Sequence, residues 1–144
     1  MIREARKEDL DQMLELYLYL HEESIPEHDE HLAEVWDKII GDEDYHVIVC
    51  EIDGKIVSSC SCYIIYNLTH NVRPFALVEY VVTHEDYRCR GYASDCLARA
   101  KEIAISKNCY KIMLMTGSKR ESTLNFYRKA GYRSDDKTGF NQKL

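Results

Sequence analysis

The first third of the chain contains two stretches in which apolar residues recur at helical spacing. In residues 8–22 one helical face collects Leu10, Met13, Leu14, Tyr17 and Leu20. In residues 29–40 the same period places on one face Leu32, Val35, Trp36 and Ile39. Pro26 separates the two stretches, because proline cannot continue a helix. The pattern therefore predicts two amphipathic helices, with Asp29 or Asp42 as candidate caps and Gly41 at the second end.

The middle of the chain changes to strand-like patterning. Residues 45–52 and 55–66 are rich in β-branched, aromatic and apolar side chains, and Asp53-Gly54 lies between them. An Asp-Gly pair between two such runs is typical of a type I′ hairpin turn. After a loop at residues 67–74, the apolar run 75–83 predicts a further strand, interrupted by one carboxylate, Glu79.

A strand, a short polar turn and a helix start follow one another from residue 75 onward. The helix is predicted over residues 92–107, because apolar residues recur there at the 3.6-residue period. A helix start directs unpaired N–H groups and the positive end of the dipole at one place, which suits a phosphate. Gly91 would allow the backbone to approach such a ligand closely. The alternative is that Gly91 is an ordinary turn glycine.

The remaining pattern predicts an α/β fold with a mixed sheet. Short strands are expected at residues 2–5, 110–116, 132–134 and 138–142, and a helix within residues 118–129 that Gly131 closes. A strand–helix–strand unit such as 75–116 should form a right-handed parallel crossover. We therefore expect one domain over residues 1–144, with a twisted sheet of about six to seven strands flanked by about four helices.

Two motifs carry a resemblance to a known family. Arg88-x-x-Gly91-x-Ala93 resembles the acyl-CoA pyrophosphate loop of the GNAT N-acetyltransferase superfamily, and the run from Asn125 to Tyr132 is similar to its second signature. They occur in the family's order, with one helix and one strand between them. The resemblance implies the GNAT fold and an acetyl-CoA-dependent N-acetyltransferase, an acyltransferase that moves an acetyl group from coenzyme A to an amine in a ternary complex.

The resemblance also implies where coenzyme A binds. Pantetheine would lie along the strand at Val81, Val82 and Thr83, with a backbone N–H near Val82 facing the oxyanion. The pyrophosphate would lie on Arg88, Cys89, Arg90, Gly91, Tyr92, Ala93 and Ser94. Asn125 would hydrogen-bond the pantetheine arm. The side chains of Arg88 and Arg90 could add charge-assisted bonds, or could be solvated loop charges.

Two residues are candidates for proton transfer. Tyr127 matches the family's tyrosine that protonates the leaving thiolate, and a phenol with a pKa of about 10 is protonated at neutral pH; it could instead be a core aromatic residue. Glu79 is the best base candidate, because burial in an apolar strand would raise its pKa toward neutrality. His84 and a water molecule are the alternatives, and Glu79 could instead be a structural carboxylate.

Charge and composition indicate which ligands and which cellular environment the protein suits. The net charge of −6 is uneven, with −11 in residues 1–46 and +5 in the rest. The basic part suits a polyanionic cofactor, and the acidic part suits a cationic amine or consists of solvated helices. Six cysteines without Cys-x-x-Cys spacing are typical of reduced thiols in a cytoplasmic protein, and no metal is expected. No apolar stretch approaches the about 20 residues of a membrane span, and no nucleic-acid-binding motif occurs.

The acceptor is the least constrained part of the prediction. We expect a primary amine of a small molecule, such as an amino sugar or a polyamine, bound between the first two helices, the 67–74 loop and the C-terminal strands. An amine of a protein or peptide is an alternative, as is a non-catalytic acyl-CoA-binding sensor. The sequence leaves open whether the protein forms a homodimer.

Overall fold

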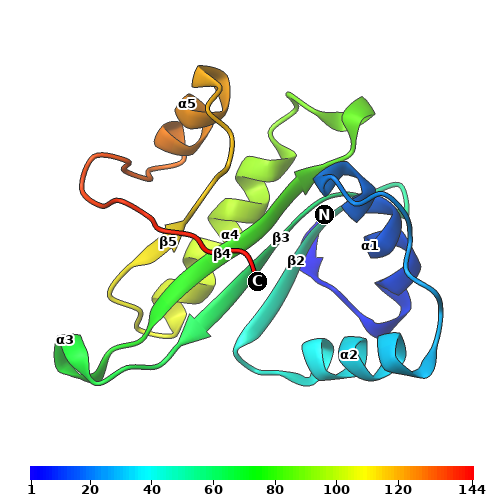
Figure 1. Ribbon diagram of the computed structural model, residues 1–144, viewed down its shortest axis with the longest axis horizontal. Coiled ribbons are helices and arrows are strands. Elements are labelled where there is room, and N and C mark those ends of the chain that lie inside the picture. The colour runs from blue at the N-terminus through cyan, green and yellow to red at the C-terminus, as the bar shows by residue number, and fades with distance from the viewer.

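A five-stranded mixed sheet forms the centre of the computed structural model, which describes residues 1–144 (Figure 1). The strands lie in the order β1-β2-β3-β4-β5, namely β1 (Ile2–Glu4), β2 (Tyr45–Ile52), β3 (Lys55–Ile65), β4 (Phe75–Thr83) and β5 (Ile112–Leu114). The first four pair antiparallel, and β5 pairs parallel to β4. The mixed sheet and the parallel crossover predicted for residues 75–116 are confirmed.

Four of the five helices begin close to the predicted positions, and one short helix lies within the expected loop at residues 67–74. The five helices are α1 (Leu10–Tyr17), α2 (Glu30–Gly41), the single turn α3 (Thr69–Val72), α4 (Tyr92–Ser106) and α5 (Glu121–Lys129). The Asp29 side chain caps α2 by accepting a bond from the Leu32 N–H at 2.8 Å. The first helix is shorter than expected, because the chain tightens into a 3₁₀ turn (Leu18–Leu20) and then turns at His21, whose φ is 67°. No helix has the length and apolar character that crossing a membrane requires.

The sheet separates two hydrophobic cores. Alternating residues of β2 face opposite sides, so that Val47 and Val49 pack with α1 and α2, while Ile48 and Cys50 pack with α4. Helix α4 contributes buried residues to the second core, and Phe126 and Tyr127 of α5 pack against the same core. Helices therefore cover both faces of the sheet, as Figure 1 shows.

The hairpin turn has the predicted geometry. Asp53 and Gly54 both have positive φ values, 50° and 79°, as a type I′ turn requires. The two strands on either side pair from Tyr45–Tyr63 to Ile52–Lys55.

The predicted C-terminal strands at residues 132–134 and 138–142 are wrong. The chain after α5 contains no strand, so the sheet has five strands instead of six to seven (Figure 1). Residues 133–144 are almost all polar or glycine, and they lack the apolar alternation that would hold a strand against the core. Within this C-terminal segment, Gly139 lies against the Met115 side chain. A Cβ atom at position 139 would be only 3.3 Å from the Met115 sulfur.

Candidate functional site

The edge of β4 that faces β5 is covered only in part. Parallel pairing joins Ala76, Leu77 and Val78 of β4 to β5 and stops there. Residues 79–83 continue past the end of β5 with no strand on that side. Backbone N–H and C=O groups along this free edge can therefore bind an extended ligand in the way that an added strand would.

A β-bulge lies at the start of this free edge. The register between β3 and β4 shifts so that Tyr80 and Val81 together oppose Cys60 alone. Tyr80 adopts a left-handed backbone conformation with φ 55°, which is rare for a bulky residue. A bulge leaves its extra residue outside the regular ladder and bends the strand. The bulge therefore bends β4 beside the end of β5.

A cleft of about 1190 Å³ crosses this part of β4. One wall comes from α1, α2 and the chain that joins them; the floor contains Val78, Glu79, Tyr80 and Val81; the other wall comes from residues 115–118 and α5. The cleft thus brings together the two residues predicted to transfer protons, Glu79 and Tyr127, although they are 48 positions apart in the sequence. The first two helices line it as expected, whereas the 67–74 loop does not.

Glu79 lies on the side of the sheet that faces α1 and α2. In the register of the sheet it is opposite Ser61, which in turn is opposite Val47, so these three side chains share one face. Val47 belongs to the core under α1 and α2. The Glu79 side chain is half-buried and no protein group forms an ion pair with it, so its carboxylate is free to bind an amine.

Tyr127 reaches the cleft from α5. Burial raises the pKa of its phenol above the ordinary value of 10.0, and the Cys60 thiol and the Glu79 carboxylate raise it further. The ring packs edge-on against Phe126 and Tyr132, with centroids 5.0 and 6.4 Å away. Tyr127 is therefore a half-buried, protonated phenol close enough to Glu79 to be influenced by its charge.

The predicted phosphate loop lies between β4 and α4. Gly91 has φ 89° immediately before α4, and a Cβ placed there would meet no atom within 4 Å. The loop is largely exposed, and it precedes a helix of 15 residues whose first amides face outward at this point. The residues present therefore fit a phosphate group of coenzyme A, because backbone donors, open space and a permissive glycine coincide.

The other predicted residues have more varied surroundings. Arg88 donates from Nε to the Thr83 carbonyl at 3.2 Å, and Arg90 lies 5.4 Å from the Tyr87 ring centroid. The Val82 side chain is buried, and its carbonyl accepts a bond from Ser58 Oγ at 2.9 Å. Asn125 is exposed, does not line the cleft, and accepts a bond from Arg128 at 3.0 Å.

His84, the alternative base, lies outside the cleft. Its Nε2 is 3.2 Å from the Tyr19 hydroxyl and 3.1 Å from Lys55 Nζ, and its Nδ1 accepts the Asp86 N–H. These contacts hold the ring in the loop that joins β4 to α4. The geometry therefore favours Glu79 over His84 as the group that faces the acceptor.

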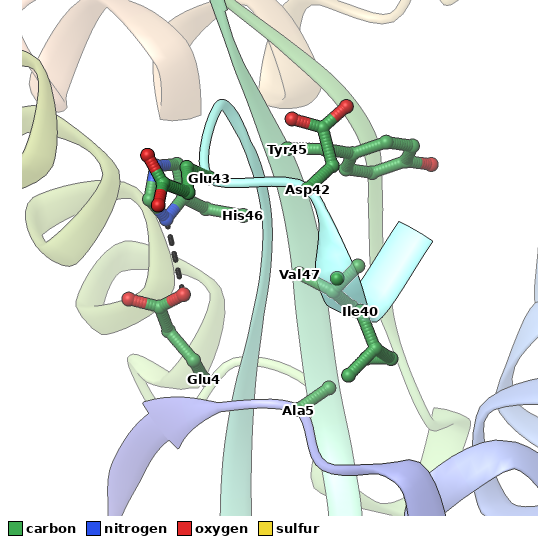
Figure 2. A pocket seen from close by; sticks show the side chains of 9 residues that line it. Glu4, Ala5, Ile40, Asp42, Glu43, Tyr45, His46 and Val47 are labelled. Carbon is green, nitrogen blue, oxygen red and sulfur yellow. Dashed lines mark hydrogen bonds and ion pairs between the residues drawn. The ribbon is translucent and has the colours of Figure 1, made fainter. Parts of the chain in front are cut away.

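A second, smaller pocket of about 210 Å³ lies beside β1, β2 and the end of α2 (Figure 2). His46 bonds Glu4 there through Nδ1 at 3.0 Å, as the dashed line in Figure 2 shows. Asp42 and Glu43 also line this pocket. It contains none of the predicted site residues.

Metal ligands do not cluster in the structure, since no group of three or more His, Cys, Asp or Glu side chains is arranged to hold a metal ion. All six cysteines are free thiols. Cys60 and Cys62, two positions apart on β3, are both buried in the core under α4.

Comparison with known proteins assigns the chain to a family. A model described as Acetyltransferase (GNAT) family matches residues 10–132. The chain belongs to the GNAT acetyltransferase family. A protein of Agrobacterium tumefaciens str. C58, assigned as an acetyltransferase, is 33% identical, and its structure superposes with a TM-score of 0.92 over 100% of this chain and 99% of its own.

Two curated GNAT-type relatives are also similar. The glucosamine 6-phosphate N-acetyltransferase of Trypanosoma brucei brucei is 34% identical over 84 residues, which are 58% of this chain and 55% of that protein. An uncharacterized N-acetyltransferase of Methanocaldococcus jannaschii is 29% identical over 137 residues, or 91% of this chain and 59% of that protein. The chain thus spans little more than half the length of these relatives.

Within this GNAT fold, sequence reasoning missed the bulge residue Tyr80 and the segment 115–118. Tyr80 looks like any other aromatic residue of an apolar strand, and only the strand register reveals its left-handed backbone. The segment 115–118 follows β5 and lines the cleft opposite α1 and α2. The sequence did contain a signal for segment 115–118, because ligands commonly bind at the carboxyl ends of parallel strands.

Proposed function

We propose that this protein is an N-acetyltransferase that moves an acetyl group from acetyl-CoA to a primary amine of a small molecule, by direct transfer in a ternary complex. One observation carries the proposal: a half-buried carboxylate, Glu79, and a protonated phenol, Tyr127, share one cleft on the free edge of β4. Membership of the GNAT family supports it. We take residues 1–144 as one N-acetyltransferase domain.

Holding the cofactor falls to two segments of the chain. The N–H groups at Arg88–Ser94 would bind the pyrophosphate, and the free edge at Val81, Val82 and Thr83 would bind the pantetheine arm. Asn125 would contribute a hydrogen bond after releasing Arg128. Bound acetyl-CoA supplies a thioester whose acetyl carbon a neutral amine can attack. Fixing the two reactants in one cleft provides most of the rate through positioning.

Glu79 would prepare the acceptor. An alkylamine resembles the lysine side chain, with a pKa of about 10.4, and is therefore protonated at neutral pH. Its ammonium is attracted to the Glu79 carboxylate, which takes the proton directly or through one water molecule. A backbone N–H near Val82, beside the bulge, would bind the oxygen on which negative charge develops.

Tyr127 would complete the reaction. Its raised pKa keeps the phenol protonated at neutral pH, so that it can donate a proton to the leaving thiolate of coenzyme A. The acetylated nitrogen would release its second proton to water in the cleft, and the phenol would regain a proton from the same water, so that one proton is released overall.

Removing the Tyr127 hydroxyl tests this assignment. We expect Tyr127→Phe to lower kcat about 10²–10⁴-fold, the usual contribution of a general acid, while the dissociation constant for coenzyme A stays the same. Thiol release with an amine panel measures turnover, mass spectrometry of the amine shows whether it gains the acetyl group, and calorimetry measures binding. Tyr66→Phe, at an exposed tyrosine outside the cleft, is the matched control.

Two results would contradict the proposal. Unchanged turnover in Tyr127→Phe would remove the acid role and leave the enzyme class in place. Binding of acetyl-CoA with no acetyl transfer to any small amine would instead indicate an acyl-CoA-binding sensor or an acetyltransferase for protein amines.

A further inference from the structure

The wall of the cleft formed by α1 and α2 is apolar. Of the 26 residues that line the cleft, 16 are hydrophobic, and most of them lie on this side. They include Leu10, Leu14, Leu32, Val35 and Ile39. Val35 is more than one-third exposed, and the other four are half-buried, so these side chains are accessible from the cleft, while Leu10 and Ile39 also pack against the core under α1 and α2. A wall of this kind gains free energy by covering an apolar ligand group.

Charge in the cleft complements a cation. Arg120 is the only arginine or lysine among the lining residues, and it immediately precedes α5, on the wall opposite α1 and α2. Glu22 and Glu79 contribute carboxylates. Recognition of a phosphate or carboxylate group normally uses arginine or lysine side chains. The end of the cleft beside α1 and α2 therefore has no arginine or lysine to pair with an anionic acceptor, His21 being its basic side chain, and it offers Glu79 to an ammonium.

Tyrosines line the boundary between the apolar wall and Glu79. The Tyr80 ring lies 6.2 Å from the Tyr17 ring, and Tyr45 also lines the cleft. Behind them, the Tyr63 hydroxyl donates to the Tyr45 hydroxyl at 3.1 Å, and their rings are 4.5 Å apart. Tyrosine faces bind both apolar groups and ammonium ions.

Tyr80 is the most unusual member of this group. It is 48% exposed, so burial in the core does not explain why an aromatic residue occupies a left-handed position next to Glu79. Strained conformations of this kind occur preferentially where a protein binds a ligand. The Tyr80 ring lies beside Tyr17 of α1, and both rings line the same cleft as Glu79.

We propose that the acceptor is a primary amine on an apolar or aromatic body without an anionic group, and that Tyr80 and Tyr17 bind that body while Glu79 binds the amine. This inference rests on the proposed acetyl transfer and adds the class of acceptor. A phosphorylated amino sugar, the substrate named for the trypanosomal relative, is then a poor acceptor for this protein.

An acceptor comparison tests the inference. We expect kcat/KM for phenethylamine and hexylamine to exceed that for glucosamine 6-phosphate by about tenfold or more, as differences in one pocket contact commonly produce. Tyr80→Asn removes the ring and suits the left-handed backbone, because asparagine tolerates that conformation. It should raise KM for phenethylamine about tenfold, while kcat and the affinity for acetyl-CoA stay within about twofold. Tyr66→Asn is the matched control and should change none of these values.

Binding without turnover separates this inference from the proposed function. Calorimetric titration of phenethylamine into the complex with coenzyme A should show binding that Tyr80→Asn weakens about tenfold. Preference for glucosamine 6-phosphate, or equal binding of phenethylamine by the wild type and Tyr80→Asn, would overturn the acceptor class and leave acetyl transfer intact. Binding of phenethylamine without its acetylation would instead contradict the proposed function and support the acceptor site.

Discussion

Gly91 has an unusual backbone conformation in the loop before α4. Its φ of 89° lies where residues with a Cβ are strained, and the space above it is open. Two residues earlier in the same loop, Cys89 also has a positive φ, of 59°. Backbone amides in such a turn point to a common side, as anion-binding loops require.

Replacing Gly91 with alanine should therefore weaken cofactor binding. A left-handed conformation costs an alanine about 1–2 kcal/mol, so the loop would shift or bind with less favourable energy. We expect Gly91→Ala to raise the dissociation constant for coenzyme A about 5–30-fold in calorimetry. Gly41→Ala, at a glycine without positive φ and with open space around it, should leave the affinity unchanged. Equal affinity in Gly91→Ala and wild type would mean that the loop conformation is not used for binding.

At the scale of elements, α2 owes its position to its first turn and one aromatic residue. Asp29 caps the helix through the Leu32 N–H, and Trp36 is buried and donates from Nε1 to the Lys7 carbonyl at 2.9 Å. These contacts hold α2 in place as part of one wall of the cleft. Most other side chains of α2 are exposed. Few other contacts would therefore hold the helix if the Asp29 and Trp36 hydrogen bonds were lost.

Loss of the cap should destabilise the protein measurably. We expect Asp29→Ala to lower the free energy of unfolding by about 1 kcal/mol, within the range of about 0.5–2 kcal/mol for such caps. Urea denaturation measures this difference. Glu34→Ala, on the exposed side of the same helix, should change it by less than about 0.5 kcal/mol. If the two variants have equal stability, the cap does not hold α2.

The sequence predicted correctly those elements that depend mainly on their own residues and little on distant parts of the chain. The Asp53-Gly54 turn and the bounds of β4 agree with the sequence prediction, because turn chemistry and an apolar run are local signals. The predicted strands after α5 failed, since a strand also needs a partner edge and an apolar face. The bulge at Tyr80 depends on the register between β3 and β4, which no local pattern encodes. Glu79 and Tyr127 were predicted one by one, but their shared cleft follows from the fold.

At the scale of the whole molecule, the core between the sheet and α4 contains an unusual number of thiols. Cys50, Cys60, Cys62 and Cys96 are all buried there. Burial raises the pKa of Cys62 and of Cys96 to about 12, and that of Cys60 well above its ordinary value. The folded protein therefore keeps these protons at alkaline pH, when the unfolded chain has lost them.

This difference predicts alkaline destabilisation with a defined slope. Above about pH 8.5 the unfolded chain binds fewer protons than the folded protein, so stability falls as pH rises toward 12. Each such thiol contributes about 1.4 kcal/mol per pH unit. We expect Cys62→Ala to reduce the slope of unfolding free energy against pH, measured by urea denaturation between pH 9 and about 10.5, by about that amount. Cys89→Ala, at an exposed thiol, should leave the slope unchanged, and an unchanged slope in Cys62→Ala would contradict the account.

The most direct test of the central claim is the thermal stability of the protein with acetyl-CoA, with coenzyme A and with no ligand. A ligand that binds only the folded protein, at 100 times its dissociation constant, stabilises it by about 2.7 kcal/mol. We predict a clear upward shift of Tm with both ligands. A folded sample whose Tm does not move with either ligand would contradict cofactor binding at Arg88–Ser94 and, with it, the proposed acetyl transfer.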